Sequence, residues 1–442
     1  MTASDHDTDG TARLASAFTR LWAELAGIGR DAGGGYRRFA YSAAELELRA
    51  WFRAAAQERG LAVEEDRAGN LWAWWGDPPA PDAPADQRAV VTGSHLDSVP
   101  SGGAFDGPLG VVSALLAVDE LRRHAEVADA VTVESAPRQP AARPRRPLAV
   151  VVFADEEGAR FGVACAGSRL LTGQLAPDTA LARTDEDGHT LAEVLRRTGR
   201  DPHAVGPSPA TVAAIGAFVE LHVEQGRGLI DLDGPVAVGS AIRPHGRWRF
   251  DLVGRADHAG TTRLTDRDDP MLAHARLVLA AREAAARRGR ADVVATVGRV
   301  MVTPNAVNAI PSQVRSWLDA RADEVSEVRD IVTELEAEAG VAAVEESFSP
   351  RVELDPGLAD RVARVAGRVV GTPPPRLATG AGHDAGILAT AGVPTAMLHV
   401  RNPTGVSHAP AEHAELEDCL VGVQVLTAVL ADLLGIDLAA AP

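Results

Sequence analysis

Two short apolar runs, each followed at once by acidic residues or a histidine, restrict the fold of this chain most strongly. The runs are residues 89–93 (AVVTG) and 148–155 (LAVVVFAD), and both are rich in β-branched side chains. Such runs are typical of strands that are buried on both faces of a sheet. A helical pattern begins at Gly110, after the first run. Strands that alternate with helices predict an α/β fold in which helices cover a mostly parallel sheet.

The sequence pattern changes near residue 240, which predicts a second domain. Residues 246–256 (GRWRFDLVGRA) alternate apolar and polar side chains, as an antiparallel strand with one solvated face does. From about residue 355 helical periodicity returns. A chain of 442 residues is long enough to bury two cores. We therefore expect a discontinuous catalytic domain, residues 1–240 and 355–442, into which an α+β domain of residues 241–354 is inserted.

Local signals before residue 150 predict further elements. Helical periodicity covers residues 11–27 and 43–60. Residues 67–70 join two β-like runs, which predicts a hairpin. Residues 125–147 lack periodicity and contain a cluster of Pro and Arg, so we expect a flexible insertion there.

Composition excludes several classes of protein. The formal net charge of −17 disfavours a nucleic-acid partner, because phosphate binding relies on clustered Lys and Arg. No apolar window is long enough for a membrane span, and the polar, acidic N-terminus does not resemble a signal peptide. Cys165 and Cys419 are the only cysteines, which excludes a disulfide framework and fits a reducing compartment. We expect a cytoplasmic protein.

Ligand-type side chains follow the first apolar run. His95 and Asp97 stand at the end of the predicted strand, and Asp106 lies between Gly103 and Gly107. In open α/β sheets, ligands bind at the carboxyl ends of the strands. We expect His95 to bind a metal and Asp97 to accept the other ring N–H of His95. Hydrogen-bonded turn residues are the alternative, but the paired spacing and the glycines weigh against it.

The second apolar run ends in three adjacent acids, Asp155, Glu156 and Glu157. Such a cluster at the end of a buried strand is electrostatically costly unless cations or protons compensate for it. A solvated acidic turn is one explanation. Metal ions explain the cluster better, because one Glu then binds a metal and its neighbour is free to act as a general base.

His222 in a β-like run (VELHVEQG) and His408 in the segment VSHAPAE complete the set of candidate ligands. Histidine and carboxylate ligands without cysteine suit Zn²⁺, Mn²⁺, Co²⁺ or Ni²⁺ rather than Ca²⁺. Two histidines and one carboxylate make one site, so the surplus of ligands predicts two divalent ions that share a bridging carboxylate.

These motifs, in this order, resemble those of the M20 metallopeptidase superfamily, and within it the branch of allantoate amidohydrolases and N-carbamoyl-L-amino-acid hydrolases. The resemblance runs from about residue 45 to the C-terminus and rests on five motifs: H-x-D, GG-x-FDG-x-x-GV, DEEG-x-R-F, HVEQG and SH-x-P-x-E. It implies a di-zinc exopeptidase-like fold with Asp106 as the bridging ligand. One ion then takes His95 and His222, and the other takes Glu157 and His408. Glu156 becomes the general base, with Asp97 behind a ligating histidine.

The resemblance also implies that the inserted domain is a lid that dimerises and contributes substrate contacts. The matching residues are His258, Asn308 and Arg321 in the inserted domain, with Gln225 and His383 in the catalytic domain. Arg321 suits a substrate carboxylate, and His258 and Asn308 can donate to an oxyanion, His258 from the partner subunit. The chain departs from the branch at Arg263, where the branch usually has proline.

The resemblance implies hydrolysis of a linear ureido C–N bond, and we expect allantoate as the substrate, with release of ammonia and carbon dioxide. An N-carbamoyl-L-amino acid or N-carbamoyl-β-alanine is the alternative, since each presents a ureido group beside a carboxylate. An aminoacylase or dipeptidase of the same superfamily is a further alternative. An inactive relative that serves as a binding protein would have lost ligands or the base, and all are present.

Overall fold

The computed structural model describes residues 3–132 and 145–438 of the chain. The contacts within it divide the chain into two compact units. Unit 1 consists of residues 1–240 and 353–442, and unit 2 of residues 241–352. These boundaries lie within two residues of the domain limits that the change of sequence pattern predicts.

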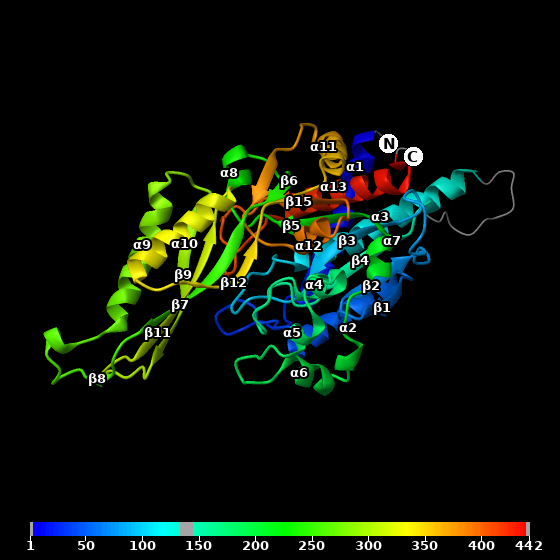
Figure 1. Cartoon of the computed structure of the whole chain (residues 1–442). Coiled ribbons are helices and arrows are strands. Elements are labelled where there is room, and N and C mark those ends of the chain that lie inside the picture. Colours follow the sequence, from blue (N-terminus) through cyan, green and yellow to red (C-terminus); the bar gives the residue numbers. More distant parts are fainter. Residues whose placement is uncertain (1–2, 133–144, 439–442) are drawn as a thin grey trace. The chain divides into compact units, whose positions relative to one another are not determined.

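Unit 1 is built on one mixed sheet whose centre is parallel (Figure 1). Its strand order is β1-β2-β4-β3-β5-β15-β6-β13, and β14 also pairs with β6. The strands are β1 (Ala62–Glu65), β2 (Leu71–Trp75), β3 (Ala89–His95), β4 (Leu148–Phe153), β5 (Ile215–Val223), β6 (Val236–Ile242), β13 (Val352–Glu353), β14 (Arg376–Thr379) and β15 (Thr395–Val400). β4, β3, β5 and β15 run parallel to one another, whereas β1, β2 and β6 pair antiparallel.

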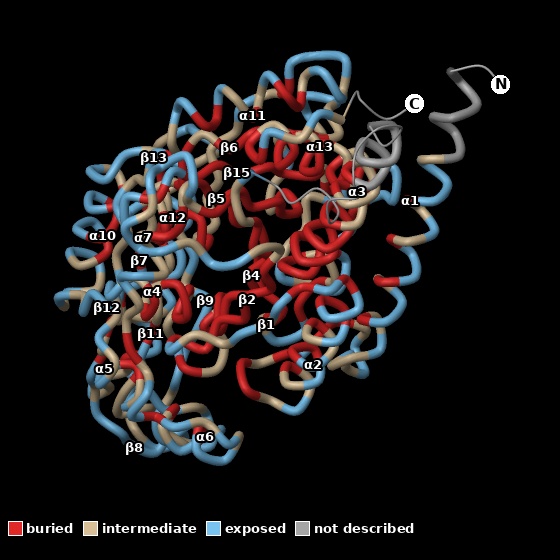
Figure 2. The backbone as a smooth tube through the Cα atoms, turned by 90° about the vertical axis from the view of Figure 1, so that its right-hand side faces the viewer, coloured by how far each residue is buried: buried red, intermediate tan, exposed pale blue. Residues whose placement is uncertain are grey.

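Helices cover both faces of this sheet, as the apolar runs predict. The helices of unit 1 are α1 (Ala3–Leu25), α2 (Ala43–Glu58), α3 (Pro108–Thr132), α4 (Ala166–Thr172), α5 (Pro177–Leu181), α6 (Leu191–Arg197), α7 (Pro209–Ala214), α8 (Gly228–Leu232), α11 (Pro356–Val370), α12 (Asp384–Thr390) and α13 (Leu416–Leu434). Alternate residues of each central strand face opposite sides. Val90 and Val150 pack in the core with α1, α2, α3, α11 and α13, and Val91 and Val151 pack in the core with α4, α5, α6 and α12. Figure 2 shows the buried residues, in red, along the central strands and along α3 and α13.

The predicted hairpin and the predicted insertion have different outcomes. β1 and β2 pair antiparallel around residues 66–70, so the hairpin is confirmed. The expected absence of structure from residue 125 is wrong over its first part, because α3 continues to Thr132. The segment HAEVADAVT has no helix breaker, so helix propensity carries α3 past the end of its amphipathic pattern. Residues 133–144 of the expected insertion lie outside the described residues.

Unit 2 is an antiparallel sheet covered on one face by two helices. Its elements are β7 (His245–Val253), β8 (Asp257–His258), α9 (Pro270–Arg287), β9 (Val294–Thr303), β10 (Ala309–Ile310), β11 (Gln313–Arg321), α10 (Val325–Ala339) and β12 (Val344–Ser349). The sheet order is β12-β7-β11-β9, and β8 and β10 form a separate two-stranded pair. The side chain of Asp269 accepts a hydrogen bond from the amide of Met271 and so caps α9.

Two further observations concern the helices and the cysteines. Within the described residues, no helix has the length and apolar character that a membrane crossing requires. Cys165 and Cys419 are both buried and free.

Candidate metal centre

His95 and His222 reach the same point from two neighbouring parallel strands. β3 and β5 pair with Thr92 opposite Val219. Three residues further along each strand, the two imidazoles lie stacked with their ring centroids 5.8 Å apart. Both rings are buried. Because parallel strands end at the same edge of a sheet, the strand register brings these two predicted ligands together.

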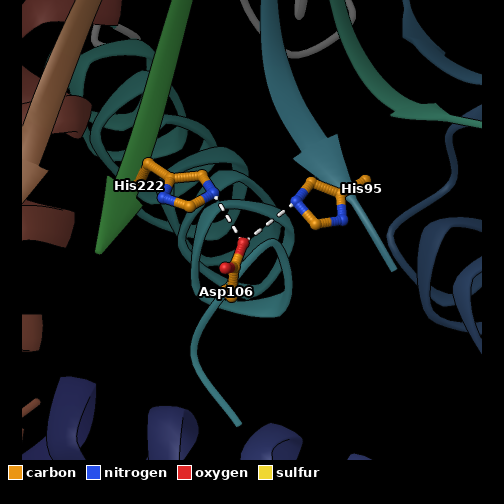
Figure 3. Close-up of side chains that lie close together, drawn as sticks. All are labelled: His95, Asp106 and His222. Atoms are coloured by element: carbon orange, nitrogen blue, oxygen red, sulfur yellow. Dashed lines mark ion pairs between the residues drawn. The ribbon is translucent and has the colours of Figure 1, made fainter. Parts of the chain in front are cut away.

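Asp106 lies between the two imidazoles (Figure 3). Its Oδ1 is 3.3 Å from Nε2 of His95 and 3.2 Å from Nε2 of His222. The next residue, Gly107, has a φ of 86°, and a Cβ at this position would lie 2.5 Å from Cε1 of His95. Only glycine permits this close approach, so the glycine-rich loop is what lets the carboxylate reach both histidines.

A second group of candidate ligands uses the other oxygen of Asp106. Nε2 of His408 lies 3.3 Å from Oδ2 of Asp106 and 3.4 Å from Oε2 of Glu157. Ligand atoms of Asp106, Glu157 and His408 all lie within 4.8 Å of one another, and the same holds for His95, Asp106 and His222. The two groups therefore share Asp106, which is the arrangement predicted for a bridging carboxylate.

A strained turn separates the three acids that follow β4. Asp155 has a φ of 53°, which is rare for a residue with a side chain. After this turn the next two side chains diverge. Oε2 of Glu156 lies 3.8 Å from Nε2 of His95, whereas Oε2 of Glu157 lies against His408. The acidic triplet thus supplies one carboxylate to each side of the cluster.

Asp97 holds the neighbouring loop rather than the imidazole alone. Its carboxylate accepts hydrogen bonds from the amides of Glu156 at 3.2 Å and Glu157 at 3.1 Å. Nδ1 of His95 lies 3.1 Å from the main-chain oxygen of Asp97 and 3.5 Å from the carboxylate. The main-chain oxygen of Asp97, and not its carboxylate, is therefore the nearer acceptor for the ring N–H of His95. The side chain of Asp97 instead holds the backbone amides of Glu156 and Glu157.

The carboxyl group of Glu156 is buried beside the cluster. Its Oε1 accepts a hydrogen bond from Sγ of Cys165 at 3.4 Å. Burial raises the pKa of Glu156 well above its usual value; the charge of His95 opposes this rise and that of Asp384 adds to it. A carboxyl whose pKa is raised in this way is suited to taking up and returning a proton.

The candidate ligands compensate one another's charges. Burial disfavours ionised Asp106, but the imidazoles of His222 and His408, close to its two oxygens, hold its pKa well below the usual value. Burial raises the pKa of Glu157 to about 7, and the charge of Asp106 adds to this effect. Burial opposes the charged form of His408, yet its hydrogen bond with Asp106 and the charge of Glu157 raise its pKa to about 9.

The donor atoms fit divalent metal ions. Nε2 of His95 and Nε2 of His222 are buried and have no hydrogen-bond partner within the described residues. A buried polar atom without a partner is costly, and a metal bond is one way to satisfy it. Each group offers imidazole nitrogen and carboxylate oxygen without thiolate, which suits Zn²⁺, Mn²⁺, Co²⁺ or Ni²⁺.

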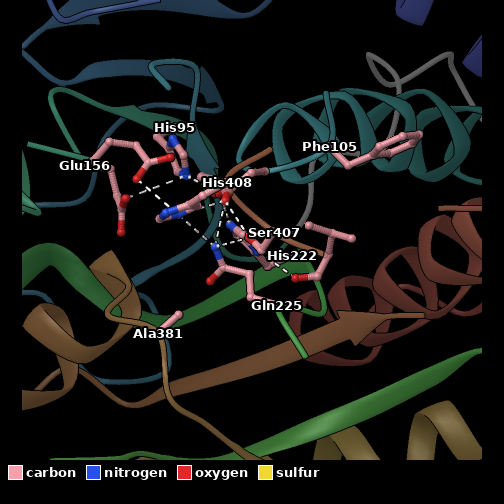
Figure 4. Close-up of polar contacts among 12 residues, drawn as sticks. His95, Phe105, Glu156, His222, Gln225, Ala381, Ser407 and His408 are labelled. Carbon is pink, nitrogen blue, oxygen red and sulfur yellow. Dashed lines mark hydrogen bonds and ion pairs between the residues drawn. The ribbon is translucent and has the colours of Figure 1, made fainter. Parts of the chain in front are cut away.

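Gln225, predicted as a substrate contact, lies directly against the cluster (Figure 4). Its Nε2 donates to Oδ2 of Asp106 at 2.6 Å and to Oγ of Ser407 at 3.2 Å. Its Oε1 is buried without a hydrogen-bond partner within the described part of the chain. The amide therefore presents an unused acceptor next to the carboxylate of Asp106.

His383, also predicted as a substrate contact, is buried behind a ligand. Its ring packs edge-on against His222, with centroids 4.5 Å apart, and its other neighbour is His399 at 6.5 Å. Burial, together with the charge of His222, holds the pKa of His383 well below its usual value. This is the environment of a neutral imidazole that supports His222, and its role as a substrate contact stays a prediction.

The predicted lid residues occupy the two ends of the unit 2 sheet. His258 and Asn308 are exposed and lie together, since β8 and β10 pair with His258 opposite Ala309. Arg321 ends β11, whose other end is Gln313, so the two ends are roughly 27 Å apart at about 3.4 Å per residue. The guanidinium of Arg321 binds both oxygens of Asp319, at 2.7 and 3.0 Å.

Arg263, where the branch usually has proline, keeps a proline-like backbone. Its φ is −63°, and it caps a short 3₁₀ turn at Leu264–Asp266. Proline fixes φ near about −65°, so the backbone at Arg263 has a φ that proline could also adopt.

Two buried glutamates next to the candidate ligands are not predicted by the sequence analysis. Glu220 accepts hydrogen bonds from Ser94 Oγ at 2.8 Å and from the amide of Ala385 at 3.2 Å. Its spacing of two residues from His222 in a strand was the available signal, because it places both side chains on one face. Glu412 holds the backbone of Asp106. It belongs to the SH-x-P-x-E motif, but its partner is 306 residues away in sequence.

The carboxyl edge of this mostly parallel sheet carries two groups of histidines and acids that share Asp106 and could hold divalent ions, which is the arrangement expected of a metal-dependent hydrolase. The sequence profile of Peptidase family M20/M25/M40 matches residues 91–432. An N-carbamoyl-L-amino acid amidohydrolase of Geobacillus stearothermophilus is 37% identical over 92% of this chain and 96% of its own. An allantoate amidohydrolase of Escherichia coli is 30% identical over 95% of this chain and 97% of its own.

A solved structure gives the same result. A hydantoinase/carbamoylase-family amidase from Burkholderia vietnamiensis superposes with a TM-score of 0.80 at 29% identity, over 96% of this chain and 97% of its own. The chain therefore belongs to the M20/M25/M40 peptidase family. Within it the chain is a hydrolase of C–N bonds, of the allantoate and N-carbamoyl-amino-acid amidohydrolase type.

Proposed function

We propose that this chain hydrolyses the linear ureido C–N bond of a small ureido acid with the help of two divalent ions. The observation that carries the proposal is the buried carboxyl of Glu156 beside two ligand groups that share Asp106. His95, Asp106 and His222 would hold one ion, and Asp106, Glu157 and His408 the other. Bound divalent ions lower the pKa of water and polarise a carbonyl oxygen.

The protein side chains supply the proton transfers and the orientation. Glu156 accepts a proton from the attacking water and returns it to the leaving nitrogen, and its raised pKa suits both steps. Asp97 keeps Glu156 in place through its backbone amide. Gln225 offers its free carbonyl oxygen to the ureido N–H groups. Hydrolysis of the terminal amide releases ammonia, and the carbamate left behind decomposes to carbon dioxide and an amine.

Two substrates fit this chemistry. Allantoate is the substrate that the sequence motifs predict. The N-carbamoyl-L-amino acid amidohydrolase is the more similar of the two named relatives, at 37% against 30% identity, and this favours an N-carbamoyl-L-amino acid. We infer that an N-carbamoyl-L-amino acid is the substrate to test first. Arg321 would bind the carboxylate of either substrate. The substrate would either replace Asp319 as the partner of the guanidinium or share the guanidinium with it.

Ammonia release distinguishes these alternatives. The metal-free protein is loaded with Mn²⁺ and assayed with allantoate, N-carbamoyl-β-alanine and N-carbamoyl-L-methionine, and a chelator-treated sample is the control. We expect ammonia from one of these ureido acids and none after chelation. Turnover of an acyl-amino acid or a dipeptide, without ammonia from any ureido acid, would overturn the proposal in favour of an aminoacylase or dipeptidase.

We also propose that the chain forms a homodimer through unit 2. Twelve of the fifteen large hydrophobic side chains exposed in the described residues lie within residues 241–352. They include Leu272 and Leu279 of α9 and Met301 of β9. β9 is a ten-residue edge strand, and an open edge with apolar side chains is a template for pairing with a second copy.

A dimer would explain why the lid residues lie far apart within one unit 2. His258 and Asn308 lie at one end of the unit 2 sheet and Arg321 at the other, so one unit 2 does not bring them together. We propose that Arg321 serves the site of its own chain and that His258 reaches the site of the partner subunit. This arrangement would make each active site incomplete without the second copy.

A further inference from the structure

The carboxylate of Glu412 ties together two loops that carry candidate metal ligands. Glu412 lies in the segment between β15 and α13, and only 4% of it is exposed. Its Oε1 accepts hydrogen bonds from the amide of Phe105 at 2.8 Å and from the amide of Asp106 at 2.9 Å. The residue that supplies the shared carboxylate is therefore held through its own backbone by a side chain from the far end of the sequence.

The other oxygen of Glu412 faces the His408 loop. Oγ of Ser407 lies 3.4 Å from Oε2 of Glu412 and 3.4 Å from Oδ2 of Asp106. Figure 4 shows Ser407 within this polar cluster, while the ring of Phe105 points away from it. The carboxylate of Glu412 thus contacts the backbone amide of Asp106 and also Ser407, the residue before His408.

The first loop is shaped around this carboxylate. A Cβ at Gly103 would lie 2.2 Å from Oε1 of Glu412, so only glycine leaves room for the contact. The loop of Gly103 and the loop of Glu412 are therefore built to meet at this point. No other role in the proposed reaction uses Glu412.

The two proposed ion sites depend on this contact to different degrees. His95 and His222 lie on adjacent strands and are buried, so the sheet itself fixes their separation. His408 lies on a loop, its side chain is 49% exposed, and its φ of 56° is strained. The spacing of His408 from Asp106 has no strand pairing to set it.

We propose that Glu412 is a positioning residue that sets the spacing between Asp106 and His408, and that it thereby determines the affinity of the ion site formed by Asp106, Glu157 and His408. This inference rests on the proposed two-metal function. Removal of Glu412 should weaken that site and leave the His95–Asp106–His222 site intact. A change in a residue behind a metal ligand typically costs about 10- to 100-fold in metal affinity.

Titration of the metal-free, full-length protein with Zn²⁺ tests this proposal, with calorimetry for affinity and elemental analysis for stoichiometry. We expect two ions in the wild type. Glu412→Ala should bind one ion with wild-type affinity and the second about 10- to 100-fold more weakly. Glu412→Gln keeps an acceptor oxygen for both amides and should bind both ions nearly as the wild type does. Glu412→Asp withdraws the carboxylate by one methylene and repeats the test should the alanine variant not fold.

The matched control is Asp355→Ala. Asp355 caps α11 by accepting a hydrogen bond from the amide of Leu358 at 2.7 Å, and its own amide binds Thr395 at the start of β15, away from the carboxyl edge of the sheet. This variant should lower the melting temperature without changing either metal affinity. Equal affinities in wild type and Glu412→Ala, or equal weakening of both sites, would overturn the role of Glu412. A wild type that binds fewer than two ions would instead overturn the two-metal function itself, and the inference with it.

Discussion

The carboxylates of Glu156 and Glu157, neighbours in the chain, lie against different histidines. Oε2 of Glu156 is 3.8 Å from Nε2 of His95, and Oε2 of Glu157 is 3.4 Å from Nε2 of His408. The left-handed backbone of Asp155 immediately before them turns the chain sharply. Because the two side chains diverge, one can act on a proton while the other binds an ion.

This division of roles predicts different consequences for two similar substitutions. Glu156→Gln removes the proton acceptor but no ligand, so turnover should fall by about 10²–10⁴-fold while both ions stay bound. Glu157→Gln should lose an ion from the Asp106–Glu157–His408 site. Steady-state rates and metal content by elemental analysis distinguish the two variants. Retained turnover in Glu156→Gln would remove Glu156 from its proposed role.

Metal affinity should depend strongly on pH. Without metal, the pKa of Glu157 is about 7 and that of His408 about 9, so both groups carry protons below these values. An ion binds only their deprotonated forms and must displace these protons. The affinity of this site should therefore fall as the pH falls, by about tenfold per unit between pH 9 and 7 and by about a hundredfold per unit below pH 7.

Calorimetry in buffers of different ionisation enthalpy checks this expectation. Near pH 8 the binding of an ion to this site should release about one proton, and near pH 6 about two. In the variant His408→Ala, the affinity should no longer fall between pH 9 and 7, because the proton that His408 carries in this range is absent. A pH-independent affinity between 6 and 9 would contradict the assignment of these two residues as ligands.

Much of the fold could be predicted because it follows from local pattern. The runs at residues 89–93 and 148–155 are buried strands, β3 and β4, since β-branched apolar residues without alternation fit a sheet covered on both faces. Asp269 and Pro270 begin α9, because their capping chemistry is local. The sequence pattern predicts a shorter α3, because the last turns of this helix form through helix propensity and have no amphipathic pattern.

The candidate site also has features that the sequence pattern predicts and features that it does not. The candidate ligands could be predicted because they follow strand ends, where parallel topology brings them to one edge. The contacts of Glu412 with Phe105 and Asp106 could not, because they join residues more than 300 positions apart and no periodicity encodes such a pair. The main-chain contact of His95 with Asp97 was also missed, since spacing shows which residues are near but not which oxygen accepts.

The apolar surface of unit 2 predicts which substitutions would separate the proposed dimer. Leu272 and Leu279 on α9 are 61% and 62% exposed, so their replacement by Asp should not disturb the core. A buried carboxylate is costly, and the double variant should be monomeric if these leucines lie in the interface. Leu232→Asp in unit 1, where the side chain is 55% exposed, is the matched control and should remain dimeric. Light scattering after size-exclusion chromatography measures the outcome, and a dimeric double variant would move the interface elsewhere.

Two inactive variants should restore activity to each other when mixed. His258→Ala and Arg321→Ala would each remove one proposed substrate contact from every site of the proposed homodimer. If His258 serves the partner's site, a mixed dimer contains one site with both residues intact and one with neither. Random exchange makes half of the dimers mixed, so the mixture should recover about a quarter of the wild-type activity. Each variant incubated alone is the control. If His258 instead serves its own chain, every site of the mixed dimer lacks one residue, and mixing restores nothing.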